Sequence, residues 1–250
     1  MRIQYCSDLH LEFAQNNKFL SKNPLKVAGD ILILAGDIVP FHDDFLNYSF
    51  FNYISDSYQQ VFWLPGNHEF YYKDISEFGT SFNISIKKNI SFINNIDIEF
   101  GNIKFLFSTL WSKISFDKEK IIEQSVSDFG CISNNNKPFR VSDYNAQHSQ
   151  AKNFIETSVR NKIPEVVVTH HLPSYLCNSP IHMNSILNDA FCVDLSGYIE
   201  ESNVKFWIYG HSHFNQKPLY IGNTLLLTNQ LGYVDVNEHD SFKNDAYFVL

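Results

Sequence analysis

Five short apolar runs, each followed at once by polar or glycine residues, constrain the fold of this chain more than any other feature. In chain order they are RIQYC at 2–6, DILILA at 30–35, VFWLP at 61–65, EVVVT at 165–169 and VKFWIY at 204–209. Short continuous runs of β-branched and aromatic residues are typical of strands buried on both faces of a sheet. The long stretches between them leave room for helices, so the sequence predicts a mixed α/β fold.

Apolar residues at helical intervals predict helices between these runs, over 43–60, 72–88 and 145–161, with a shorter helix over 193–202. Two glycine–asparagine pairs predict hairpins, with turns at Gly101-Asn102 and at Gly222-Asn223. The segment 112–144 has the weakest periodicity and predicts either a long loop or a small cap with a helix over 118–127. Long segments over a scaffold often carry specificity.

Composition narrows the classes of protein to consider. The 250 residues are 44% hydrophobic and show no shift in composition, which predicts one domain over 1–250. The formal net charge of −8, without a lysine or arginine block, disfavours nucleic acid as a partner. No apolar stretch approaches the roughly 18 residues that span a membrane. Four scattered cysteines without a C-x-x-C pair suit a reducing compartment, so we predict a cytoplasmic protein.

Each predicted strand is followed by side chains that can bind a metal ion. They are Asp8 and His10, Asp37, Asn67 and His68, His170, and His211 and His213. Side chains alternate along an extended chain, so the two histidines of G-H-S-H face the same way. Strand ends of an α/β sheet meet at one crevice, where these residues would converge. Oxygen and nitrogen donors suit two divalent ions, and the imidazoles favour Mn²⁺, Fe or Zn²⁺ over Mg²⁺ alone. Two such ions roughly 3.5–4 Å apart can clamp a phosphoryl group.

The motifs D-x-H, G-D, G-N-H-E, a histidine after a strand, and G-H-x-H follow one another between residues 8 and 213. In this order they resemble the calcineurin-like metallophosphoesterase superfamily. Any one motif is weak evidence, whereas the ordered set is highly specific. The resemblance implies a four-layer fold, with a central β-sandwich flanked by helices and a dinuclear metal site of Mn²⁺, Fe²⁺/Fe³⁺ or Zn²⁺ at the strand ends.

The resemblance also implies a role for each motif residue. Asp8, His10 and His213 would hold the first metal, Asn67, His170 and His211 the second, and Asp37 would bridge both. A bridging hydroxide would attack phosphorus in line, and His68 would act as the general acid that protonates the leaving oxygen. Seven protein ligands leave positions open for hydroxide and phosphate, as a catalytic site requires.

One motif departs from the protein-phosphatase subgroup, which carries G-D-x-x-D-R-G. Here the sequence is GDIVPFHDD, with Pro40 where the second aspartate would stand. This disfavours a protein serine/threonine phosphatase and leaves the acidic partner of His68 unassigned. Asp43 and Asp44 are the candidates, because a working histidine is expected to have a carboxylate partner. Glu69 is predicted to orient its loop rather than to bind metal.

Four further residues are of interest beside the motifs. Tyr71, Tyr72 and Trp111 are candidates to line the substrate pocket, since aromatic rings beside a metal site can stack on a nucleobase or sugar, although packing is the ordinary role of such residues. His171 either touches the substrate or packs behind the ligands.

The preferred hypothesis is a metal-dependent phosphoesterase that acts on a small phosphorylated molecule, with diesters and monoesters both open. One alternative is a nucleic-acid phosphodiesterase, which the acidic charge balance disfavours. Another is a non-catalytic metal-binding scaffold, which ranks last because all seven expected ligands and His68 are present.

Overall fold

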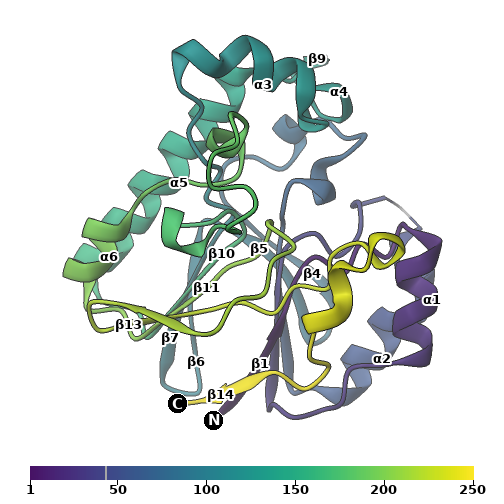
Figure 1. Cartoon of the computed structure of the whole chain (residues 1–250). Coiled ribbons are helices and arrows are strands. Elements are labelled where there is room, and N and C mark those ends of the chain that lie inside the picture. Colours follow the sequence, from purple (N-terminus) through teal and green to yellow (C-terminus); the bar gives the residue numbers. More distant parts are fainter. Residues whose placement is uncertain (43) are drawn as a thin grey trace.

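Two six-stranded β-sheets form the centre of the computed structural model, which describes residues 1–42 and 44–250 (Figure 1). The strands of the first sheet are β1 (Arg2–Cys6), β2 (Ile31–Ala35), β3 (Gln60–Leu64), β4 (Phe82–Lys87), β5 (Ile90–Asn94) and β14 (Tyr247–Val249). Those of the second are β6 (Ile96–Phe100), β7 (Ile103–Ser108), β10 (Val166–Thr169), β11 (Phe206–Ile208), β12 (Leu219–Ile221) and β13 (Thr224–Leu227).

Both sheets have parallel centres and antiparallel edges. The first has the order β14-β1-β2-β3-β5-β4 and the second the order β12-β13-β11-β10-β7-β6. The four inner strands of each sheet are parallel, and both edge strands pair antiparallel. Parallel inner strands point their carboxyl ends to one edge, where ligands commonly bind.

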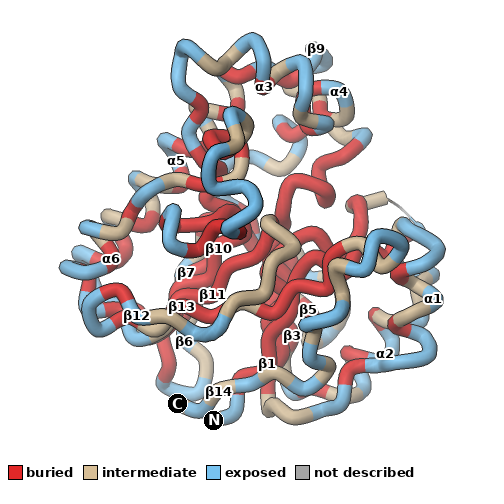
Figure 2. Tube along the Cα trace, viewed as in Figure 1, coloured by how far each residue is buried: buried red, intermediate tan, exposed pale blue. Residues whose placement is uncertain are grey.

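The outer faces of the two sheets are covered by α1 (Ala14–Lys22), α2 (Ser49–Ser57), α5 (Val141–Asn161) and α6 (Ser196–Ser202). The shorter helices α3 (Glu119–Ser125) and α4 (Asp128–Cys131) lie instead in the segment 112–144. Alternate residues of β2 face opposite ways: Ile31 and Ile33 pack against the second sheet, whereas Leu32 and Leu34 pack on the side of α1 and α2. The second sheet packs against α5 and α6. The result is the expected four-layer arrangement, with its most buried residues in the central strands (Figure 2).

All five predicted strands are present, and so are both hairpins, as β6–β7 and β12–β13. The helix predicted over 145–161 exists and begins earlier, at Val141, whereas that over 193–202 begins later, at Ser196. In the segment 43–60, the structure has a short 3₁₀ turn, Phe45–Asn47, followed by α2; Asp43 lies outside the described residues.

The prediction of a helix over 72–88 is wrong. The structure has a 3₁₀ turn at Ile75–Glu77 and then β4, which pairs with β5. Phe82 is buried, and Ile84 and Ile86 pack against the same core cluster, so the apolar period of this stretch is two residues. Pairing with β5 buries that apolar face, which a helix at this place would not do.

Residues 112–144 form a small cap at the top of Figure 1. It contains the 3₁₀ turn Phe116–Lys118, α3, α4 and a two-stranded hairpin of β8 (Ser133–Asn134) and β9 (Lys137–Pro138). Its helix α3 is shorter than the one predicted over 118–127. A separate apolar cluster holds the cap to the body of the protein through Phe70 and Trp111. That 1–250 is one domain stays a prediction. Within the described residues, no helix has the length and apolar character that crossing a membrane requires.

Candidate metal centre

The seven predicted metal ligands follow the carboxyl ends of β1, β2, β3, β10 and β11. Five of them have left-handed backbone conformations: Asp8 (φ 55°), His10 (φ 46°), Asp37 (φ 55°), His211 (φ 74°) and His213 (φ 50°). This conformation costs an L-residue roughly 1–2 kcal/mol each. Such strain is characteristic of functional sites, where the surrounding structure holds it in place.

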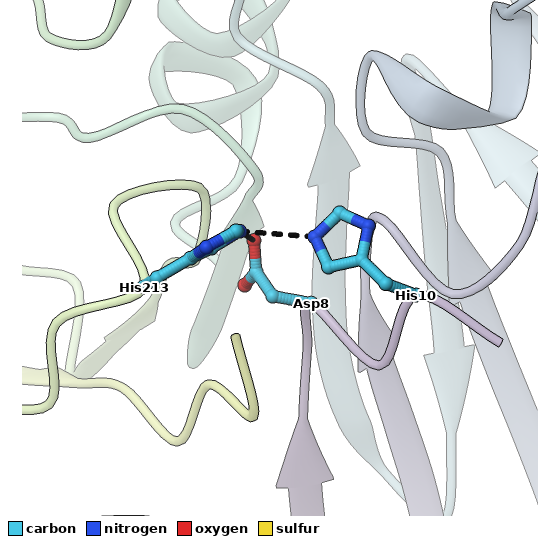
Figure 3. Close-up of side chains that lie close together, drawn as sticks. All are labelled: Asp8, His10 and His213. Carbon is cyan, nitrogen blue, oxygen red and sulfur yellow. Dashed lines mark hydrogen bonds and ion pairs between the residues drawn. The ribbon is translucent and has the colours of Figure 1, made fainter. Parts of the chain in front are cut away.

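Asp8, His10 and His213 form the first cluster (Figure 3). His10 Nε2 and His213 Nε2 lie 2.9 Å apart, and His213 Nε2 is 3.5 Å from Asp8 Oδ1. His10 and Asp8 are fully buried. The three side chains lie in the loops that follow β1 and β11. These strands belong to different sheets, so the packing of the two sheets assembles this cluster.

His170 is the centre of the second cluster. Its Nε2 atom lies 3.3 Å from Asp37 Oδ2, 3.2 Å from Asn67 Oδ1 and 3.2 Å from His211 Nδ1. Donor atoms from four different loops therefore meet around His170. The donor atoms of Asp37, His170 and His211 lie within 4.8 Å of one another, close enough to hold one metal ion.

Asp37 lies between the two clusters. Its Oδ2 atom is 3.3 Å from His170 Nε2 and 3.9 Å from His10 Nε2. Burial opposes ionisation of this carboxyl, but the imidazoles of His170 and His68 outweigh burial and hold its pKa well below the usual value. One carboxylate is thus charged and within reach of both clusters.

Outer hydrogen bonds show that the donor atoms suit metal ions. The outer ring nitrogens meet oxygens as follows: His10 Nδ1 and Glu12 Oε1 at 3.2 Å, His213 Nδ1 and Glu238 Oε2 at 2.6 Å, His170 Nδ1 and the Ala35 carbonyl at 2.9 Å. Donation at Nδ1 leaves a lone pair on each Nε2. The inner nitrogens of His10 and His213 then face each other at 2.9 Å. Two ring nitrogens this close need a proton or a metal ion between them, and the mixture of imidazole and carboxylate donors around them fits a divalent metal ion.

Glu12 is the acidic partner of His68, in place of the two aspartates considered from the sequence. Its Oε1 atom lies 2.9 Å from His68 Nδ1 and 3.2 Å from His10 Nδ1. Asp44 is exposed, and Asp43 lies outside the described residues. Burial lowers the pKa of His68, but Asp37 and Glu12 outweigh burial and raise it. The sequence did hold a signal, because Glu12 follows His10 by two residues.

Asp128, in α4 of the cap, fixes the orientation of Asn67. Its Oδ1 atom accepts hydrogen bonds from Asn67 Nδ2 at 2.8 Å and from the Tyr71 hydroxyl at 2.9 Å. The amide nitrogen is thereby held on the cap side, and Oδ1 of Asn67 faces His170. Sequence reasoning missed Asp128, since nothing in 112–144 indicated that this segment returns to the strand ends.

Glu69 joins the loops after β2 and β3, as expected from the sequence. The carboxylate accepts from the backbone amides of Asp37 (2.9 Å), Ile38 (2.7 Å) and Gly66 (2.6 Å), and from Trp63 Nε1 (3.0 Å). The side chain is fully buried. The four groups that donate to this carboxylate are buried with it, so each would lose its acceptor if the side chain were removed.

Glu69→Ala is therefore expected to lower the free energy of unfolding by about 3–5 kcal/mol, since it leaves four buried donors without an acceptor. Chemical denaturation measured by circular dichroism tests this. The matched variant Glu201→Ala, at an exposed position of α6, should change stability by no more than about 0.5 kcal/mol. Equal stabilities of the two variants would contradict the role given to Glu69.

Gly66 leaves the space in which Asp37 and His170 meet. A Cβ atom at this position would lie 2.2 Å from Asp37 Oδ1 and 2.6 Å from His170 Nε2. Both distances are far below van der Waals contact, so any larger residue must displace a ligand atom.

Gly66→Ala should thus reduce binding of Mn²⁺ at least tenfold, measured by calorimetric titration of the metal-stripped protein. Gly197→Ala in α6 is the control, because within the described structure a Cβ there meets no atom within 4 Å. Unchanged affinity in Gly66→Ala would show that Asp37 and His170 do not bind metal together.

Tyr71, His171 and Trp111 occupy different positions. Tyr71 stacks on His68, with ring centroids 4.1 Å apart, and lines the cavity described below. Trp111 and His171 are buried against each other, with ring centroids 5.2 Å apart, and neither lines that cavity. Trp111 instead joins the apolar cluster of the cap, which corrects the expectation that it lines the pocket. For His171, which packs on His211 at 4.1 Å, the structure favours the packing alternative.

A cavity of about 440 Å³ opens beside the clusters. Its floor includes Asp37, Asn67, His68, His211 and His213, and its walls come from the cap at 125–128 and the loop at 178–188. None of the described residues that line it is lysine or arginine. A phosphate in this cavity would therefore rely on metal ions and imidazoles for positive charge.

Comparisons with known proteins agree with this geometry. The family model of calcineurin-like phosphoesterases matches residues 1–215. Uncharacterized protein L509 of Acanthamoeba polyphaga mimivirus is 34% identical over 276 aligned positions, covering 99% of this chain and 96% of the relative. The crystal structure of phosphopantetheinyl hydrolase from Mycobacterium tuberculosis has the same fold, with a TM-score of 0.71 at 15% identity, over 96% of this chain and 92% of that one. The chain belongs to the calcineurin-like phosphoesterase family and is a metal-dependent hydrolase of phosphate esters.

Proposed function

We propose that the protein hydrolyses a small phosphate ester at two divalent metal ions bound by the strand-end residues. Asp8, His10 and His213 would hold one ion, Asn67, His170 and His211 the other, and Asp37 both. The position of Asp37 Oδ2, 3.3 Å from His170 Nε2 and 3.9 Å from His10 Nε2, is the observation that carries this proposal. The mixture of imidazole and carboxylate donors favours Mn²⁺, Fe or Zn²⁺.

The chain's own residues would bind and orient the ester and deliver a proton. When bound, the two ions would supply Lewis acidity and lower the pKa of water. Glu12 engages Nδ1 of His68, so the proton that His68 would pass to the leaving oxygen lies on Nε2. Asp128 holds the Asn67 amide with its oxygen toward His170. The stacked ring of Tyr71 fixes the plane of the His68 imidazole.

A small substrate is supported by the size and charge of the cavity. Its volume of about 440 Å³ lies within the range of small-molecule sites. The absence of lysine and arginine from its described walls gives no support to a nucleic-acid substrate, whose binding is dominated by such residues. Cys6, Cys131, Cys177 and Cys192 are free thiols, and they support our proposal of a cytoplasmic location.

Parallel hydrolysis of bis-p-nitrophenyl phosphate and p-nitrophenyl phosphate tests this function. We expect the metal-stripped protein to be inactive and to gain turnover on addition of Mn²⁺. Asp37→Asn should remain inactive, whereas Asp56→Asn, the same change at an exposed position of α2, should behave as wild type. A protein that binds two metal ions and hydrolyses neither ester would instead fit the non-catalytic scaffold.

A further inference from the structure

A second cavity, of about 510 Å³, lies against the catalytic one. The two share the residues His68, Tyr71, Ser127 and Tyr233 as common lining. None of the seven proposed metal ligands is among the described residues that line the second cavity. His68 therefore stands on the boundary between a cavity that reaches the metal clusters and one that does not.

This position of His68 orients the substrate. The phosphoryl group belongs in the first cavity, next to the metal ligands, and the oxygen that receives a proton from His68 must lie beside its imidazole. The group attached to that oxygen then extends past His68 and away from the metals. We infer that the second cavity binds the leaving group of the substrate, and that this leaving group is an uncharged aromatic alcohol. The inference rests on the proposed function and adds the substrate class.

Aromatic side chains dominate the second cavity. They are Phe13, Phe45, Tyr48, Tyr71, Tyr72 and Tyr233. Two of them keep large exposed fractions, 73% for Tyr72 and 42% for Phe13. Exposed rings that line a hollow offer faces on which a second ring can stack. Planar aromatic groups are the ligands that gain most from such walls.

The backbone at Tyr72 indicates that its exposure serves a purpose. Tyr72 has φ 63°, a conformation that bulky L-residues rarely adopt, and its amide donates to the Cys131 carbonyl at 2.6 Å. The bond to the cap stabilises a strained residue whose side chain is not buried. The ring centroid of Tyr72 lies 6.2 Å from that of His42 and 6.3 Å from that of Tyr71, and the residue still keeps most of its surface exposed. Strain at so exposed a residue is found at ligand clamps.

Charge selects against an anionic leaving group. Glu12 and Asp44 line the second cavity, and among its described residues there is no lysine or arginine. A phosphate, sulfate or carboxylate on the leaving group would meet these two carboxylates, and the imidazole of His68 is already engaged by Glu12 at 2.9 Å and needed at the leaving oxygen. An uncharged alcohol that carries a ring, such as a nucleoside or an arylmethanol, meets both the aromatic and the electrostatic character of these walls.

Two esters with similarly basic leaving groups test this inference, namely 2-naphthylmethyl phosphate and ethyl phosphate, each followed by release of inorganic phosphate. We expect the Mn²⁺-loaded wild type to prefer the naphthyl ester by about tenfold in kcat/KM. Tyr72→Ala should reduce that preference about five- to tenfold, mainly through KM, and Phe13→Ala should reduce it as well. Tyr220→Ala is the matched control, because this tyrosine is 69% exposed in β12, away from the site.

Binding of 2-naphthalenemethanol to the Zn²⁺-loaded protein, followed by saturation-transfer NMR, separates the inference from the proposed function. If no ester is hydrolysed but the alcohol binds and Tyr72→Ala weakens it, the cavity assignment stands and the hydrolytic function fails. If esters are hydrolysed without preference, or if Tyr72→Ala changes neither preference nor alcohol binding, the leaving-group assignment is overturned.

Discussion

Replacing Asp37 by asparagine should reduce Mn²⁺-dependent turnover of bis-p-nitrophenyl phosphate at least about a thousandfold, equivalent to about 4 kcal/mol in the barrier. Asp37 Oδ2 approaches both clusters, at 3.3 Å from His170 Nε2 and 3.9 Å from His10 Nε2. An amide keeps the shape but removes the negative charge that would be shared by two cations. The affinity of the protein for both ions should therefore fall together, whereas replacing any other proposed ligand should weaken the binding of one ion.

The readout that distinguishes this role is metal content rather than rate alone. We expect inductively coupled plasma mass spectrometry to find fewer than two bound ions per chain in Asp37→Asn and two in Asp56→Asn. His68 donates its backbone amide to Asp37 Oδ1 at 2.9 Å, and an asparagine oxygen can keep that bond, so the thermal stability of the metal-stripped protein should change little. Two tightly bound ions together with near wild-type turnover in Asp37→Asn would refute the shared-ligand role.

How much the sequence reveals depends on how local each interaction is. The proposed ligands could be predicted to lie together because each one follows an apolar strand, and the parallel strands carry them to one edge. The role of Glu69 in orienting its loop could also be predicted, because Glu69 lies one residue after His68 in the same loop. The strained backbone of Asp8, His10 and Asp37 could not be foreseen, because it results from the loops being held against each other by bonds between distant residues.

Long-range contacts account for most of what the sequence did not show. Asp128 reaches Asn67 across 61 positions of the chain, and only the folded cap brings them together. Trp111 was a candidate for the pocket because aromatic rings can stack on a substrate, but it is buried in the apolar cluster of the cap. In 72–88, helical spacing and strand alternation were both compatible with the residues, and tertiary pairing with β5 decided for the strand.

His68→Ala should retain both metal ions and lose activity in proportion to the basicity of the leaving group. A general acid contributes about 10²–10⁴-fold when the leaving oxygen needs a proton, and much less when it does not. A plot of log kcat/KM against leaving-group pKa, over aryl phosphates from p-nitrophenyl to phenyl, should therefore be steeper for His68→Ala than for wild type. Loss of metal, or an equal loss for every ester, would assign His68 to ligand positioning instead.

Glu12→Gln tests the same proton donor from its other side, because Glu12 holds His68 without being placed to touch the phosphoryl group. Its Oε1 atom is shared by His68 Nδ1 at 2.9 Å and His10 Nδ1 at 3.2 Å. A glutamine oxygen still accepts a hydrogen bond but no longer stabilises a charged imidazole, so we expect a steeper leaving-group plot than wild type and a shallower one than His68→Ala. Glu77→Gln, at an exposed position of the 3₁₀ turn Ile75–Glu77, should match wild type. If Glu12→Gln changed metal content while leaving the slope unaltered, the carboxylate would act through His10 and not through His68.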